Sequence, residues 1–382
     1  MRKKRSSKVT YTEWMKASRI LIIVGGVCIC LVLVYTIGLN AISSVEYNRA
    51  DAEAVATSSA PAAPVVPPLD KAAYDAKMLS LANRPPLPVV SSSTASSTTS
   101  HATSTPKTYL WPAKAAVYPN PNPILPFKRI VAYYGNFYSK GMGVLGQYPP
   151  TQMITMLKNV VAQWTAADPG TPAIPAIDYI AVTAQGSAGA DGKYRLRMPD
   201  SQIDQAVTLA AQVNGIVILD VQVGLSTVQT EVPLLEKYLK MPQVHLALDP
   251  EFAMHGGAKP GSVIGSLDAT DINWASNYLA KLVQANNLPP KVLIVHRFTE
   301  DMVTRTSLIK TVPEVQFVMD MDGWGSQAKK IGTYSRVIYP EPVQFTGFKL
   351  FYKNDLKAPS TGMLTPAQVL KLTPAPSFIQ YQ

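Results

Sequence analysis

Eight short apolar runs alternate with amphipathic segments after residue 126, and this alternation limits the possible folds more than any other feature. The runs are rich in β-branched residues, a pattern typical of parallel strands buried on both faces of a sheet. They cover residues 129–135, 177–183, 215–221, 244–250, 291–297, 315–321, 336–340 and 347–352. Most of the segments between them, such as 268–287, carry apolar residues at helical spacing.

Eight strands separated by helices predict an α/β fold for residues 126–382, namely a (β/α)8 barrel of the TIM type. A helix at 365–372 is expected to close the chain. A doubly wound open sheet is the alternative. The first run continues as YYGNF instead of GxGxxG, so the usual glycine-rich signal for a dinucleotide is missing.

Residues 20–39 carry no charge and are mostly apolar. A helix of this length spans about 30 Å, the thickness of a bilayer core. A cleaved signal peptide is the alternative, but its apolar core has only about 7–15 residues and is followed by a small-residue cleavage motif. No clear motif of that kind follows residue 39. We therefore predict one transmembrane helix that is retained as an anchor.

Basic residues are concentrated before this segment. Residues 1–19 contain one acid, Glu13, against the basic residues Arg2, Lys3, Lys4, Arg5, Lys8, Lys16 and Arg19. The positive-inside rule places this tail in the cytoplasm and the rest of the protein outside it, as a single-pass protein of the cell membrane. Most of the formal charge of +10 thus belongs to the tail. It is not patterned over a folded face, which argues against a nucleic-acid partner.

Residues 40–125 are rich in Ala, Pro, Ser and Thr, a composition that predicts a disordered stalk. One short helix is expected within it, capped by Asp70. Both cysteines, Cys28 and Cys30, lie in the predicted membrane span. The barrel therefore has no thiol for disulfides, nucleophilic catalysis or metal binding. The sequence leaves the oligomeric state open.

Polar residues gather where the predicted strands end, which in a barrel of this type is where an active site is built. These positions hold Tyr133, Tyr134, Asn136, Asp220, Gln222, Asp249, Glu251, His296, Arg297, Asp320, Asp322 and Tyr352, followed by Trp324 in a loop. Side chains alternate across a strand, so Asp249 and Glu251 should face the barrel axis together, as should Asp320 and Asp322. Leu246 and Leu248 should then face the helices.

Paired carboxyl groups suit one kind of chemistry in particular. Two close acids repel each other, so one of them keeps its proton near neutral pH and can act as a general acid. Glycoside cleavage uses such a pair, and aromatic side chains in the same group would serve as platforms for sugar rings. The structural alternative is that these acids are helix caps and solvated loop residues, and that the aromatic residues are ordinary packing.

Other chemistries fit the sequence less well. A carboxylate cluster with His296 or His255 suits a hard cation, but no HxH or HExxH spacing is present. A serine hydrolase would need a GxSxG elbow, which is also missing. We therefore expect no cofactor and no metal ion.

Three of these strands resemble those of family 18 glycoside hydrolases, the chitinase-type barrels. RIVAYYGNF is similar to their first strand, LALDPEF ends in their Asp-x-Glu pair, and VQFVMDMDGW resembles their sixth-strand Met-x-Tyr-Asp. The resemblance implies that Glu251 is the proton donor, Asp249 its partner and Asp322 a residue that positions the substrate acetamido group. It also implies N-acetylglucosamine polymers as substrates, with the acetamido oxygen as nucleophile.

The chain departs from the family pattern at three positions. Val244 and Ala247 stand where the acidic motif has two earlier aspartates, and Met321 stands in place of the tyrosine. Family 25 lysozymes share the Asp-x-Glu pair but use a further acid on strand one, where this chain has Tyr133 and Tyr134. Two functions follow as hypotheses: a membrane-anchored hydrolase of cell-envelope or environmental polysaccharide, or a non-catalytic barrel that binds a glycan or another envelope partner.

The predicted topology can be tested with a reporter that is active only in the cytoplasm. Fused after Gln382, such a reporter should be inactive, because the positive-inside rule places the carboxyl-terminal domain outside. The same reporter fused to the first 19 residues is the positive control. Strong activity of the Gln382 fusion would contradict the predicted orientation.

Overall fold

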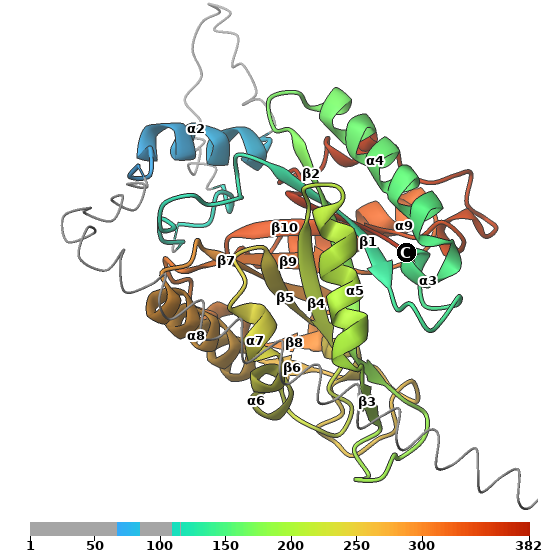
Figure 1. Cartoon of the computed structure of the whole chain (residues 1–382). Helices are drawn as coiled ribbons and strands as arrows, with labels where there is room; N and C mark the ends of the chain where they lie inside the picture. Colours follow the sequence, from blue (N-terminus) through green and yellow to red (C-terminus); the bar gives the residue numbers. More distant parts are fainter. Residues whose placement is uncertain (1–66, 85–108, 115) are drawn as a thin grey trace, which may run out of the picture. The chain divides into compact units, whose positions relative to one another are not determined.

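The computed structural model describes residues 67–84, 109–114 and 116–382. Eight parallel strands in these residues form a closed barrel, which confirms the predicted fold (Figure 1). β1 closes the barrel by pairing with a strand on each side, Ile130 with Phe378 and Arg129 with Ala173. In barrel order the strands are β1 (Arg129–Gly135), β2 (Ala173–Ala184), β4 (Ile216–Val221), β5 (Val244–Leu248), β7 (Lys291–Arg297), β9 (Val315–Met321), β10 (Phe345–Leu350) and β11 (Phe378–Tyr381).

Helices cover the outside of the barrel, and the longest of them are α4 (Pro150–Ala167), α5 (Asp200–Ala211) and α8 (Ala269–Asn286) (Figure 1). Each begins at a helix-start signal in the sequence. α4 and α5 begin at or just after a proline, and α8 begins after Asp268, whose side chain accepts a hydrogen bond from the Thr270 amide.

The remaining elements are short. They are α3 (Val144–Gln147), β3 (Arg195–Arg197), α6 (Val228–Glu231), η1 (Val232–Leu235), α7 (Glu236–Leu239), η2 (Pro250–Phe252), β6 (Leu267–Asp268), η3 (Glu300–Met302), β8 (Val303–Thr304), η4 (Thr306–Leu308), α9 (Gln327–Thr333), η5 (Tyr334–Ile338), η6 (Asn354–Leu356) and α10 (Pro366–Val369). β3 runs antiparallel to the end of β2, and β6 pairs with β8 outside the barrel.

Two predicted elements near the carboxyl end were wrong. Residues 336–340 are not a strand, because Tyr334, Val337 and Ile338 bury one face of the π-helix η5, which continues α9. The predicted helix at 365–372 is only the short α10 and does not close the chain. The eighth strand is β11, whose four residues include the polar Gln380, so it lacks the apolar run that marks the other strands.

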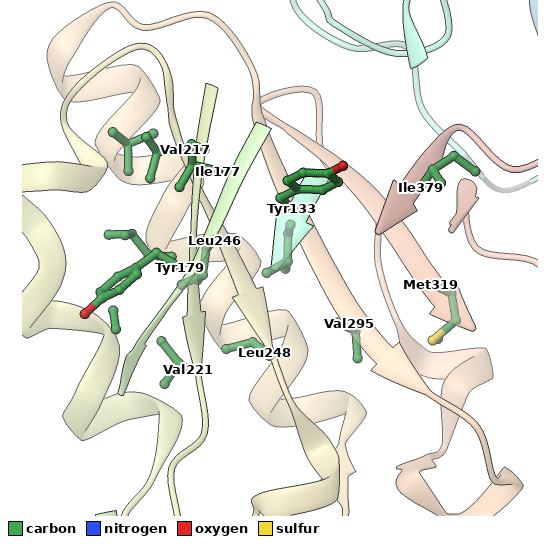
Figure 2. Close-up of a cluster of buried hydrophobic side chains, with 14 of the residues drawn as sticks. Tyr133, Ile177, Tyr179, Val217, Val221, Leu246, Leu248, Val295, Met319 and Ile379 are labelled. Carbon is green, nitrogen blue, oxygen red and sulfur yellow. The ribbon is translucent and has the colours of Figure 1, made fainter. Parts of the chain in front are cut away.

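The barrel strands bury side chains in two layers, as the alternation of the sequence predicts. Figure 2 shows part of the outer layer, which faces the helices and includes Tyr133, Leu246 and Leu248. Ala247 belongs instead to the inner apolar cluster, together with Ile130, Ala132, Ile218, Ile294 and Phe345. The predicted orientation of β5 is therefore confirmed.

A helix from the predicted stalk completes the inner cluster. α2 (Lys71–Ala82) begins after Asp70, whose side chain accepts a hydrogen bond of 2.9 Å from the Ala73 amide, as predicted. Its buried residues Tyr74, Met78 and Leu81 pack with Leu125 and the residues at the start of the strands. The backbone oxygen of Leu81 accepts a hydrogen bond of 2.7 Å from the Ala375 amide. α2 therefore covers the end of the barrel where the strands begin.

The residues before β1 are fixed to the same end. The Gln316 side chain accepts hydrogen bonds from the amides of Ile124 (2.9 Å) and Leu125 (3.2 Å) and donates one to the Leu125 oxygen. The described residues from 67 onward belong to one compact unit, which contains α2 together with the barrel. The predicted tail at 1–19, the membrane span at 20–39 and the rest of the stalk lie outside the described residues. The described part of the chain contains no helix that is long and apolar enough to cross a membrane.

Two leucines of α2 provide a matched test of this packing. Leu81 is 8% exposed in the inner cluster, whereas Leu79 is 53% exposed. We expect Leu81→Ala to lower the free energy of unfolding by about 2–4 kcal/mol through the lost contacts, and Leu79→Ala by less than about 0.5 kcal/mol. Urea unfolding of the two variants measures this difference. Equal effects would show that α2 does not support the barrel.

Candidate active site at the carboxyl ends of the strands

A cavity of about 590 Å³ opens where the barrel strands end. This volume lies within the range of about 300–1,000 Å³ that is usual for ligand-binding pockets. Of the residues predicted for the site, those that line the cavity are Tyr134, Gln222, Asp249, Glu251, Asp322 and Trp324. The cavity is therefore built from the ends of several different strands, as expected for this fold.

The Asp-x-Glu pair follows β5 directly. The strand ends at Leu248, and Asp249 then caps η2 by accepting a hydrogen bond of 3.1 Å from the Glu251 amide. The other Asp249 oxygen accepts a bond of 3.1 Å from Gln222 Nε2, which also lies 3.2 Å from the Tyr134 hydroxyl. Asp249 is thus a cap and a member of the site at once. The turn leaves Glu251 half-buried in the cavity wall.

Beneath the cavity, His296 is held between two aspartates. Its Nε2 lies 2.8 Å from Asp220 and its Nδ1 lies 3.0 Å from Asp320, and all three side chains are fully buried. Burial disfavours the charged ring, but the hydrogen bonds to the two carboxylates outweigh it and raise the pKa of His296 well above its usual range. A protonated imidazole can donate from both nitrogens, which is what this arrangement requires.

The second buried cation, Lys349, was not predicted. Its Nζ lies 3.0 Å from one Asp322 oxygen and 3.2 Å from the other, and 4.0 Å from the centre of the Tyr134 ring. Burial opposes its charge, yet Asp322 and Asp249 raise the pKa of Lys349 above its usual value. The sequence feature that could have identified it is that Lys349 is the one charged residue in the otherwise mostly apolar strand β10.

Asp178 was also missed, although it interrupts the apolar run of β2. It is fully buried and accepts a hydrogen bond of 2.6 Å from Gln380 of β11. Burial and the neighbouring Asp220 raise its pKa well above the usual range of an aspartate. The network of polar groups below the cavity therefore extends across the barrel from β9 to β2.

Carboxyl groups outnumber cations in the polar network below the cavity. The buried acids of this network are Asp178, Asp220, Asp249, Asp320 and Asp322. Within the described part of the chain, the basic side chains that form ion pairs with them are His296 and Lys349. Burial, together with the charge of Asp220, raises the pKa of Asp249 well above normal. Burial, together with the charge of Asp322, raises the pKa of Glu251 to about 6.

Besides the buried Asp220, His296 and Asp320, four other predicted site residues do not line this cavity. Tyr133 precedes the inward-facing Tyr134, and Arg297 follows the inward-facing His296. Because consecutive side chains alternate, Tyr133 and Arg297 point to the outer face of their strands. Tyr133 packs in the outer layer, with its hydroxyl 3.1 Å from that of Tyr352. Arg297 pairs with Glu341. Asn136 fixes the loop after β1, donating a hydrogen bond of 3.1 Å to the Ile180 oxygen.

The described residues contain no group of three or more His, Cys, Asp and Glu side chains arranged to hold a metal ion. His255 is partly exposed and lies 3.7 Å from Asp271, away from the cavity lining. In comparisons with known proteins, no protein-family model matches the chain and no curated protein matches it.

The pairing of Lys349 with Asp322 can be measured by a double-mutant cycle. Lys349→Met should cost about 3–5 kcal/mol of unfolding free energy, because the buried Asp322 carboxylate loses its closest cation. Asp322→Asn in the Lys349→Met protein should recover a large part of that loss. Urea unfolding of the single and double variants tests this, and additive costs would rule out the ion pair as a stabilising contact.

Proposed function

We propose that this barrel is a glycoside hydrolase in which Glu251 is the general acid. The observation that carries the proposal is the raised pKa, about 6, of the half-buried Glu251 carboxyl group in the wall of a cavity. An acid with this pKa is protonated in part of the molecules near neutral pH and can transfer the proton readily. The raised value has a physical cause in burial and in the charge of Asp322.

The reaction follows from these positions. Glu251 donates its proton to the glycosidic oxygen as the bond between that oxygen and the anomeric carbon breaks. By the resemblance to family 18, the acetamido oxygen of the substrate then bonds to the anomeric carbon, with Asp322 positioning the acetamido group. Water subsequently bonds to this carbon as its bond to the acetamido oxygen breaks, which regenerates the acetamido group, and a proton of the water passes to the Glu251 carboxylate. On the same turn, the charge of Glu251 is one of the causes that raise the pKa of Asp249, so the two carboxyl groups titrate as a coupled pair.

The cavity offers surfaces for sugar rings. Trp324 is 49% exposed at its rim, and Phe252, Phe298 and Phe351 also line it. As the substrate we propose a cell-envelope or environmental polysaccharide, because the predicted membrane span at 20–39 would hold the barrel outside the cytoplasm.

A glycan-binding barrel without catalysis is the second candidate. Both oxygens of Asp249 accept hydrogen bonds within the protein, from Gln222 and from the Glu251 amide. Both oxygens of Asp322 contact Lys349. Carboxyl groups engaged in this way have less capacity to contact a substrate. Affinity for a glycan without turnover would distinguish this function from hydrolysis.

The hydrolase proposal predicts the effect of Glu251→Gln, which keeps the size of the side chain but removes the transferable proton. We expect turnover to fall by about 100- to 10,000-fold while glycan binding is retained. The assay uses the full-length protein in detergent with labelled chitin oligosaccharides and peptidoglycan fragments. Glu314→Gln is the control, because Glu314 immediately precedes β9 at the opposite end of the barrel. Full activity of Glu251→Gln would exclude Glu251 as the general acid.

The pKa of Glu251 also predicts how stability depends on pH. Folding raises this pKa from 4.5 to about 6. The stability contributed by the protonated carboxyl group is therefore fully present below about pH 4.5 and is lost as the pH rises through about 6. Glu251→Gln should accordingly be more stable than the wild type by roughly 1–2 kcal/mol at pH 7.5 and equally stable at pH 4. Thermal unfolding at both pH values measures this, and a variant less stable at pH 7.5 would contradict the raised pKa.

A further inference from the structure

The rim of the cavity carries its charges unevenly. The connections that follow β9, β10 and β1 come from one continuous arc of the barrel, since β1 pairs with β11, β11 with β10 and β10 with β9. We call these connections loops, although the one after β9 includes α9 and η5. Exposed basic side chains on these loops are Lys140, Lys329, Arg336, Lys353 and Lys357. We refer to them as the basic arc.

Acids on the same three loops are already neutralised. Asp322 pairs with Lys349, Glu341 with Arg297, and Asp355 with Lys330. The loop between β1 and α3 contains no acid at all. Among the described residues, the one acid that forms an ion pair with the basic arc is Glu300, which lies 3.4 Å from Arg336. The arc is therefore a positively charged surface at the mouth of the cavity.

The basic arc surrounds an aromatic platform. Lys329 Nζ lies 5.0 Å from the centre of the exposed Trp324 ring, and Lys357 Nζ lies 5.6 Å from it. Trp324, Lys329 and Arg336 all line the main cavity. A sugar ring stacked on Trp324 would therefore place its substituents beside two or three cationic groups.

A second pocket continues the cavity along the arc. It has a volume of about 110 Å³ and shares Gly141, Phe351, Asn354 and Gln382 with the main cavity. Lys140 and Lys353 line it, and no acidic side chain of the described residues does. The two hollows share part of their walls and are therefore adjacent, so together they offer room for more than one sugar unit.

We propose that the substrate is an anionic glycan, a polysaccharide that carries carboxylate or phosphate groups. This inference rests on the proposed function, because it assigns the substrate class of the same cavity. In the proposed arrangement one sugar unit stacks on Trp324, and Lys329 and Arg336 contact its acidic substituents. The neighbouring units extend into the second pocket, where Lys140 and Lys353 contact theirs. The reacting bond then lies at Glu251, beyond the basic arc.

Binding measurements with matched glycans test the proposal. The full-length Glu251→Gln protein in detergent is titrated with a hyaluronan hexasaccharide, with its carboxyl-reduced neutral form, and with a glycerol-phosphate teichoic acid. We expect at least one anionic probe to bind about tenfold or more tightly than the neutral form, with a preference that weakens as salt is raised from 50 mM to 500 mM. The hyaluronan and teichoic acid arms distinguish a carboxylate from a phosphate ligand.

Charge-removal variants connect this preference to the basic arc. Lys329→Gln with Lys353→Gln should weaken anionic binding about tenfold and so remove the preference for the anionic over the neutral probe. The matched control removes two exposed lysines on outer helices, Lys158→Gln of α4 with Lys281→Gln of α8, and should have little effect. Circular dichroism of both double variants verifies that they fold.

Three results would overturn the proposal: equal affinity for the anionic and neutral probes, an anionic preference that survives Lys329→Gln with Lys353→Gln, or binding to none of the probes. Cleavage by the wild-type protein is measured separately. Hydrolysis of a neutral glycan without anionic preference would refute the substrate class and leave the hydrolase proposal intact. Selective anionic binding without any cleavage would support the substrate class and count against hydrolysis.

Discussion

The burial of more carboxyl groups than cations inside a closed barrel is the constraint on which the rest of the site depends. Asp178, Asp220, Asp249, Asp320 and Asp322 are all at most 7% exposed. A buried carboxylate without a partner costs several kcal/mol, so each acid must be paired, hydrogen-bonded or protonated. His296 and Lys349 supply two positive charges, and burial raises the pKa of Asp178, Asp249 and Asp320.

This constraint determines how the site is arranged. His296 links Asp220 to Asp320 and lies 3.7 Å from Asp322, so one ring holds acids from two strands in place. Lys349 lies against the Tyr134 ring and pairs with Asp322. These charges surround the base of the cavity. Burial raises the pKa of Glu251 and the charge of Asp322 raises it further, whereas Lys349 and His296 lower it. The pKa of Glu251 at the cavity wall therefore depends in part on the buried network below it.

The sequence predicted the parts of this structure that depend on local pattern. Strand alternation correctly placed Ala247 inward and Leu246 outward, and the Asp-x-Glu pair lies in the cavity as expected. The sequence pattern could not identify Lys349 or Asp178 as members of the site. A single polar residue in an apolar run does not reveal which residue on another strand it pairs with. The end of the first strand predicts both Tyr133 and Tyr134 at the mouth of the barrel, but consecutive residues point to opposite faces, and Tyr134 is the one that lines the cavity.

Long-range packing explains the other differences. β11 is recognisable only through its pairing with β1 and β10, and the role of α2 only through its contacts with the start of the strands.

The pKa of Glu251, measured by carbon-13 NMR of its carboxyl carbon, tests the central claim most directly. The signal is assigned from its loss in Glu251→Gln and followed from pH 3 to pH 9 in the full-length protein. The buried network predicts a midpoint of about 6. A midpoint at or below 4.5, the ordinary value for a glutamate, would contradict the account.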